Sequence, residues 1–169
     1  LAADNDNRIE VSAGAVIEVA PDMAYVNFIA KGEGATAAEA VNEAAQQMEV
    51  ARRSLLGLNI VGQDVATINY HTNAVFDAKG KRTGYAAENI VRVTVKDITK
   101  VGAVIDKITG AGVSEVSSIA FTLQDKNLYR SRLLAQAVEN ARQQAAVVAN
   151  AGGRSLGNLL SASFSSVNY

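Results

Sequence analysis

The sequence predicts an α+β protein, and three observations support that class. Between about residues 24 and 123, strand patterns and helix patterns follow one another in the order strand-helix-strand, twice. The stretch from Thr83 to Asp97 passes from a strand directly into a helix. An alanine-rich helical pattern then runs from about residue 127 to residue 150. We therefore expect a mixed or antiparallel sheet with a ferredoxin-like ββαββαβ core packed by helices, then a long alanine-rich helix and a final short strand.

The stretch from Thr83 to Asp97 is the clearest element. Val91, Val93 and Val95 alternate with polar residues, which is typical of a strand with one buried face. Asp97 then offers a carboxylate to the amides of the following turn as an N-cap. The helix after it is predicted from apolar residues at helical spacing, namely Val101, Val104, Ile105 and Ile108.

The N-terminal part of the chain predicts two further strands. Residues 9–19 alternate apolar with polar residues and predict the first strand, with a bulge at Gly14. Pro21 suits a turn, because proline fixes φ and has no amide hydrogen to donate. A second strand is expected at residues 24–31. Residues 1–8 are expected to be a flexible lead-in to a single domain over residues 9–169.

The first helix pattern covers about residues 36–56. It opens with a capping box, in which Thr36 accepts a hydrogen bond from the Glu39 amide while the Glu39 side chain reaches back. Gly57 is the expected C-terminal cap. A strand at about residues 64–76 should follow this helix.

The remaining elements follow from the same patterns. A charged hairpin loop is expected from Asp77 to Arg82, and a strand at about residues 114–123. In that strand the inward side chains should be Ile119, Phe121 and Leu123. The alanine-rich helix should pack through one narrow side, made of Leu134, Ala137, Ala141, Ala145, Val148 and Ala149. Gly152 and Gly153 should end that helix, and Leu159–Phe164 predict the final strand.

Charge and cysteine content narrow the possible functions. The 16 basic and 17 acidic residues nearly cancel, for a net charge of −1, so no basic excess is available to hold a nucleic acid. Cysteine is absent, which excludes disulfides, thiolate metal sites and cysteine nucleophiles. No apolar run approaches the roughly 20 residues that cross a bilayer. The start at Leu1 fits either removal of a secretory signal or an arbitrary boundary.

We assign no catalytic, cofactor-binding or metal-ligating residue. His71 is the only histidine and falls in a strand pattern, where a structural or exposed role outweighs catalysis. Asp64, Asp77 and Glu88 flank one hairpin, and carboxylates at such ends are normally solvated. The glycine-rich run at residues 152–157 follows a helix rather than a strand, so it predicts a helix cap and not a phosphate loop.

Three other groups of residues carry side chains that could take part in binding or chemistry. The basic tip formed by Lys79, Lys81 and Arg82 is typical of a loop that keeps a protein soluble. The serines that could act as nucleophiles lack a G-x-S-x-G context, and these are Ser54, Ser114, Ser117 and Ser118. Tyr85 is expected in the core. Three tyrosines remain open between a core and a contact-surface role, namely Tyr25, Tyr70 and Tyr129.

A set of short motifs occurs in a fixed order over about residues 9–165. These are Pro21–Ala24, Thr36–Ala40, Thr83–Tyr85, Val91–Val95 and Lys100–Asp106, with a closing run from Asn140 to Gly157. The ordered set resembles the SIMPL-domain family, which includes YggE-like bacterial periplasmic and outer-membrane immunogenic proteins. No single motif is specific to that family.

The resemblance implies a bacterial protein of the periplasm or cell envelope, with its signal peptide removed and a link to oxidative stress. It also implies a homo-oligomer, because at least one relative forms a ring-like or channel-like assembly. The family has no agreed enzymatic activity and no established catalytic residues, so we expect no enzyme and no cofactor. Without cysteine, and with Met23 and Met48 as the only methionines, a stress role should be indirect.

Two other functions stay open beside self-assembly in the envelope. The alternative is a small-molecule or peptide binding module that uses an open sheet face or a groove beside the third helix. An enzyme is the least expected of the three, because no catalytic constellation is present.

Overall fold

The computed structural model describes residues 7–113 and 115–164. It divides into two compact units. We call residues 20–124 the sheet unit, and residues 1–19 together with 125–169 the helix unit. The expectation of one domain over residues 9–169 stays a prediction. Each unit is described on its own below.

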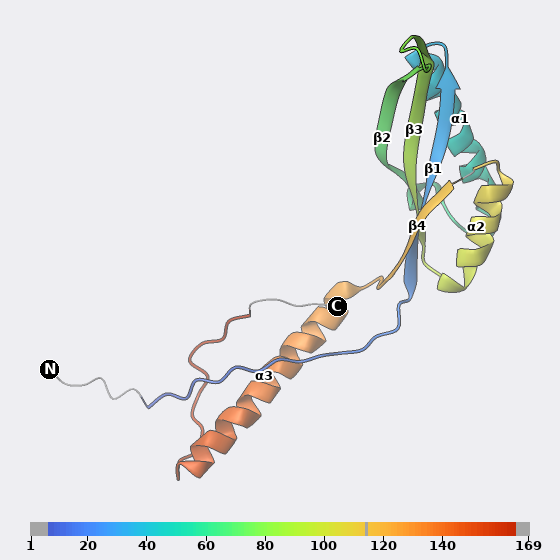
Figure 1. Cartoon of the computed structure of the whole chain (residues 1–169). Coiled ribbons are helices and arrows are strands. Elements are labelled where there is room, and N and C mark those ends of the chain that lie inside the picture. The colour runs from blue at the N-terminus through green and yellow to red at the C-terminus, as the bar shows by residue number, and fades with distance from the viewer. Residues whose placement is uncertain (1–6, 114, 165–169) are drawn as a thin grey trace. The chain divides into compact units, whose positions relative to one another are not determined.

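The sheet unit contains an antiparallel sheet with the strand order β2-β3-β1-β4. Its helices α1 and α2 lie on the same side of that sheet (Figure 1). This arrangement confirms the α+β class and the two split βαβ units. The strands are β1 (Met23–Gly34), β2 (Val65–Phe76), β3 (Arg82–Val95) and β4 (Glu115–Thr122), and the helices are α1 (Ala37–Ser54) and α2 (Val101–Gly110).

The predicted N-caps of both helices are present. Thr36 Oγ1 accepts from Glu39 N at 3.2 Å, while Glu39 Oε2 accepts from Thr36 N at 3.0 Å. Asp97 Oδ1 accepts from Thr99 N at 3.1 Å, and it caps a short 3-10 turn that continues directly into α2. The local sequence therefore sets where each helix begins.

The predicted cap at Gly57 is wrong. Helix α1 ends at Ser54, and the backbone tightens into a 3-10 turn, Leu56–Leu58, that contains Gly57. The residue in the left-handed region is Asn59, at φ 60°, two residues further on. A glycine is therefore not required at residue 57, because the 3-10 turn satisfies the helix end instead.

The core lies between the sheet and its two helices. Alternate residues of β1 and β3 face the helices, and Phe28 is the largest of the fully buried side chains. Leu55 after α1 and Ile108 in α2 close the core from the other side. The fully buried strand residues around Phe28 are small, namely Ala24, Val26, Ala30, Val91, Val93 and Val95.

Two glycines let α1 approach β1 closely. A Cβ atom on Gly34 would lie 2.7 Å from Ala40 N, and one on Gly32 would meet the backbone atoms Ala40 O and Ala44 N. Real side chains do not fit at such separations, so the helix backbone rests directly on the strand. Ala40 and Ala44, which face these glycines, are fully buried.

Ile119 and Phe121 of β4 face the core side of the sheet as predicted, but they are not buried there, since they are 43% and 58% exposed. These residues are in register with the buried Val26 and Ala24 of β1 and so share the core-facing side of the sheet. However, β4 is an edge strand, and nothing among the described residues covers this part of it. Leu123, just beyond the strand, is half-buried.

The helix unit is built on α3 (Lys126–Ala151). Asp125 Oδ1 accepts from Leu128 N at 3.0 Å and caps its start, and Gly153, at φ 71°, follows its end as predicted. The predicted alanine side is partly confirmed, because Ala145 and Ala149 are buried. Val148, at 53% exposed, does not belong to that side.

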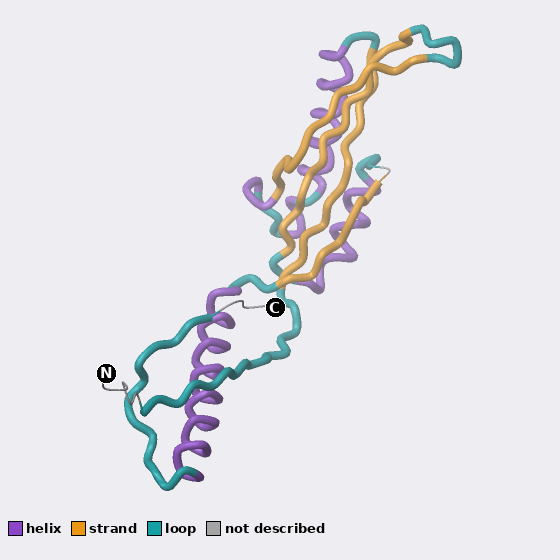
Figure 2. The backbone as a smooth tube through the Cα atoms, turned by 60° about the vertical axis from the view of Figure 1, so that its left-hand side comes forward, coloured by secondary structure: helices purple, strands orange, loops and turns teal. Residues whose placement is uncertain are grey.

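The strands predicted at residues 9–19 and 159–164 are not formed. We call residues 9–19 the N-terminal segment and residues 155–164 the C-terminal segment. The N-terminal segment runs beside α3 (Figures 1 and 2). Alternation predicts which side of a chain is covered, but a strand also needs a neighbouring strand to bond with. The neighbour here is a helix, whose backbone groups are already paired internally.

Backbone pairing in these two segments is almost absent among the described residues. Between residues that the structure describes, the N-terminal segment forms one hydrogen bond, from Asn140 Nδ2 to Gly14 O at 2.8 Å, and the C-terminal segment forms none. The predicted period is nevertheless visible in the exposure of the N-terminal segment. Its half-buried residues are Val11, Ala13, Ala15 and Val19.

Candidate functional site

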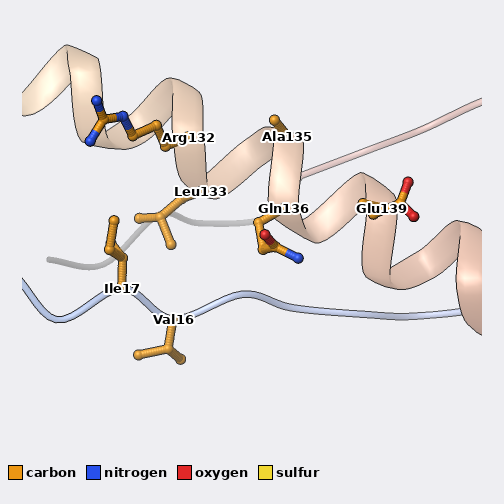
Figure 3. A pocket seen from close by; sticks show the side chains of 7 residues that line it. All are labelled: Val16, Ile17, Arg132, Leu133, Ala135, Gln136 and Glu139. Atoms are coloured by element: carbon orange, nitrogen blue, oxygen red, sulfur yellow. The ribbon is translucent and has the colours of Figure 1, made fainter.

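The N-terminal segment and α3 enclose an open hollow of about 510 Å³. Ile17 turns toward the buried Leu133 of α3, whereas Val16 points away from the helix (Figure 3). The polar rim is formed by Arg132, Gln136 and Glu139, with Ala135 completing the lining. The hollow therefore combines an apolar base with a charged edge.

Glu139 is held ionised by its neighbours on α3. Arg142 donates to both carboxylate oxygens, at 2.8 and 2.9 Å, and Gln143 Nε2 donates at 3.0 Å. These hydrogen bonds lower the pKa of Glu139 to about 2, and those from Arg142 have the largest effect. A carboxylate with that pKa cannot supply a proton near neutral pH, so this rim suits recognition rather than acid catalysis.

Stability should decrease in acid because of Glu139 and its counterpart Glu49 on α1. Hydrogen bonds from Arg52 and then Arg53 lower the pKa of Glu49 to about 2, from an ordinary value of 4.5. Both folded-state pKa values lie below the unfolded ones, so this stabilisation is complete above about pH 4.5 and is lost as the pH falls toward 2. Denaturant titrations should show that the denaturant concentration at the unfolding midpoint decreases as the pH is lowered across that range.

The variant carrying Glu49→Gln and Glu139→Gln is the control for this expectation. It cannot take up protons at these two positions, so its midpoint should fall less steeply over the same range. Equal pH dependence of the two proteins would contradict the assignment.

Large apolar side chains stay exposed over the helix unit. Val16 is 91% exposed, and in the C-terminal segment Leu159 and Leu160 are 74% and 81% exposed. Val147 and Phe164 are also exposed. Scattered exposed apolar residues are ordinary, but here they accompany two segments whose backbone is almost unpaired within the described part of the chain. The helix unit is therefore the strongest candidate for an interaction surface.

Of the sequence candidates for acid–base chemistry, the fold makes only His71 and Glu88 cross-strand neighbours, whereas Asp64 and Asp77 lie beyond opposite ends of β2. His71 is exposed on β2, in register with Glu88 of β3. Asp64 is buried before the start of β2, where Lys96 Nζ lies 2.7 Å from Oδ1, and Asp77 lies in the loop after the end of β2. Over the described ranges no group of three metal-ligating side chains is found.

The serines have structural partners. Ser54 Oγ donates to Ala51 O and Lys107 O, and Ser117 Oγ donates to Asn27 O. Ser118 Oγ accepts from Asn27 Nδ2 at 2.9 Å. Ser114 lies outside the described residues.

The tyrosines divide as follows. Tyr85 packs against the buried cluster of Ala40, Ala44 and Ala87, which confirms its expected core role. Tyr70 is partly exposed, and its hydroxyl donates to Val41 O. Two half-buried tyrosines lie under guanidinium groups, namely Tyr25 under Arg92 and Tyr129 under Arg132.

The sheet face opposite α1 and α2 carries a polar network. Arg92 Nε donates to Asn27 Oδ1 at 3.1 Å, and its guanidinium lies 4.7 Å from the Tyr25 ring centre. Lys31 Nζ lies 2.7 Å from Glu115 Oε2 and 3.9 Å from Glu88 Oε1. The cations and carboxylates of this face thus pair mainly with one another.

The residues that line the hollow were missed by sequence reasoning. Arg132, Gln136 and Glu139 recur at helical spacing on α3, and the alternation at residues 9–19 is also readable. Nothing in the sequence, however, connects the two patterns across more than a hundred residues. Only the fold reveals the hollow.

Together these features define an α+β protein with a ferredoxin-like sheet and a long C-terminal helix. The profile of the SIMPL family, described as "Protein of unknown function (DUF541)", matches residues 9–169. The chain belongs to this family. No helix among the described residues is long and apolar enough to span a bilayer.

Two relatives show the range of the similarity. The chain is 30% identical to "Uncharacterized protein YggE" of Escherichia coli (strain K12), over 96% of this chain and 67% of the relative. It is 24% identical to the "26 kDa periplasmic immunogenic protein" of Brucella melitensis, over 90% of this chain and 64% of the relative. That relative is named as a periplasmic protein.

Proposed function

We propose that this chain is a non-enzymatic protein of the bacterial periplasm or cell envelope that acts by self-assembly through its helix unit. The observation that carries the proposal is that exposed apolar side chains occur together with two segments whose backbone forms, among the described residues, a single hydrogen bond, that of Gly14 O. Unpaired extended backbone binds other chains readily, because its amides and carbonyls are free to form a ladder.

A second copy fits this surface better than a strongly charged partner. The net charge is −1, so two copies repel each other only weakly. Burying a leucine side chain such as Leu160 is worth about 1.5–3 kcal/mol, and each copy offers several such residues. The extended segments would supply hydrogen bonds with defined register.

The proposed periplasmic location is supported by the name of the Brucella relative. An oxidative-stress role would be indirect. The chain has no cysteine to act as a thiol reductant, and it has 2 methionines. Its contribution would then come through assembly in the envelope rather than through chemistry on an oxidant.

Multi-angle light scattering over a wide concentration range tests the proposal. The unaltered protein should form a discrete assembly, and Leu160→Glu should shift it toward the monomer. The matched control is Ser161→Glu, which adds the same charge at an exposed polar neighbour and should keep the assembly. A strict monomer at all concentrations would rule out self-assembly.

A binding module is the second candidate, supported by the sheet face that α1 and α2 leave open in the sheet unit (Figure 1). A ligand on this face would contact the side chains of Tyr25, Asn27 and Arg92. A monomer whose melting temperature rises with a small molecule or peptide, but not in Tyr25→Ala, would favour this function. Hydrolytic or redox turnover lost in His71→Ala would instead indicate an enzyme.

A further inference from the structure

The loop between β2 and β3 is held in one conformation by its own residues. Asp77 N donates to Lys81 O at 2.9 Å, and Gly80 N donates to Asp77 O at 3.0 Å. Asp77 Oδ1 also accepts from the amides of Lys79 and Lys81, both at 2.9 Å. Gly80 takes a φ of 76°, which suits glycine. The loop is preorganised, and its carboxylate is engaged within it.

The basic side chains of this loop have no acidic partner. Lys79, Lys81 and Arg82 are exposed, and none forms an ion pair with a carboxylate in the described part of the chain. By contrast, Lys31 and Lys96 each pair with one. Three cations and one carboxylate within six residues concentrate positive charge in a protein whose net charge is −1.

Apolar side chains lie directly beside these cations. Phe76, the last residue of β2, is 59% exposed, and Val75 before it is 40% exposed. Arg82, the first residue of β3, lies with its guanidinium 5.3 Å from the Tyr85 ring centre. The end of this hairpin, where the loop joins the two long strands in Figure 2, is therefore both basic and apolar.

We propose that this hairpin end, residues 75–82, docks on an anionic lipid bilayer. Lys79, Lys81 and Arg82 contact the headgroup phosphates, and Phe76 enters the interface between headgroups and acyl chains. A bilayer uses both features, whereas a free phosphate ion would use only the cations. Nucleic acid would need a larger basic surface. Docking by one copy does not require self-assembly.

Co-sedimentation of the full chain with vesicles tests this docking. Vesicles of equal parts phosphatidylglycerol and phosphatidylcholine should bind roughly 30- to 150-fold more strongly than phosphatidylcholine alone, from the attraction of two to three charges at about 1 kcal/mol each. The triple variant Lys79→Gln, Lys81→Gln, Arg82→Gln should lose most of that preference. Phe76→Ser should weaken binding to the anionic vesicles and leave the salt dependence in place.

Two control variants separate docking from general charge and from misfolding. The first control is a triple variant that removes three exposed cations elsewhere, Lys107→Gln, Lys126→Gln, Arg130→Gln. It should bind the anionic vesicles like the unaltered protein. Lys79→Arg, Lys81→Arg keeps the charge and should also bind normally. Equal binding of the two triple glutamine variants would overturn the proposal. Release by inorganic phosphate, but not by sodium chloride of equal ionic strength, would also overturn it, because the site would then be an anion site.

Discussion

Gly32→Ala should lower the free energy of unfolding by about 1–3 kcal/mol, the usual cost of overpacking a core. The new methyl group would meet Ala40 O and Ala44 N, and these are backbone atoms of α1 that cannot rotate away. The helix must therefore lift from β1, which loosens the packing of Ala40 and Ala44 at the same time. Denaturant unfolding of the purified variant measures the change.

Gly102→Ala is the matched control. Gly102 lies inside α2 with no atom near the position of its missing Cβ, so alanine should be neutral or should stabilise the helix by about 0.5–1 kcal/mol. If both variants lost the same stability, the close approach of α1 to β1 would not be the cause.

Phe28→Ala should lower the free energy of unfolding by about 3–5 kcal/mol, as expected for a fully buried phenylalanine. The side chain lies at the middle of β1, packed within the cluster that includes Val91, Leu55 and Ile108. These neighbours come from different elements, so they cannot close together over the space that the ring leaves. Thermal and denaturant unfolding should both report the loss.

Phe121→Ala provides the comparison within the same sheet. Its ring is 58% exposed on the edge strand β4, so the substitution should change stability by no more than about 0.5 kcal/mol. A large loss would mean that Phe121 is buried in solution, as its alternating pattern had first predicted. The comparison of Phe28 with Phe121 thus tests whether the core-facing side chains of β4 are exposed.

The elements that could be predicted are those whose signals are local. Val91, Val93 and Val95 are all fully buried, and Asp97 caps the turn that follows, because strand period and cap chemistry depend on adjacent residues. The strand order β2-β3-β1-β4 also follows from the order of elements along the chain. Local patterns were therefore enough to place the helices and strands of the sheet unit along the chain.

The predictions that failed depended on partners far away in the sequence. The N-terminal segment has the correct alternation, but none of the described strands lies beside it to complete a ladder. Ile119 and Phe121 face the expected side, but an edge position leaves them uncovered. The hollow on α3 needs Ile17 and Leu133 together, and no pattern in either stretch predicts that contact.

Asn140 and Gly14, which are hydrogen-bonded, are 126 residues apart in the sequence, and the whole sheet unit lies between them along the chain. In the folded sheet unit Met23 is paired with Thr122, so the two arms that carry Gly14 and Asn140 start side by side only after this unit has formed. We therefore expect the sheet unit to fold first and the N-terminal segment to reach α3 last. During that delay, α3 of a neighbouring copy offers the same surface to the segment. The segment can then bind α3 of its own chain or α3 of the neighbouring copy. Exchange of the segment between copies should therefore increase with the local concentration of folding chains.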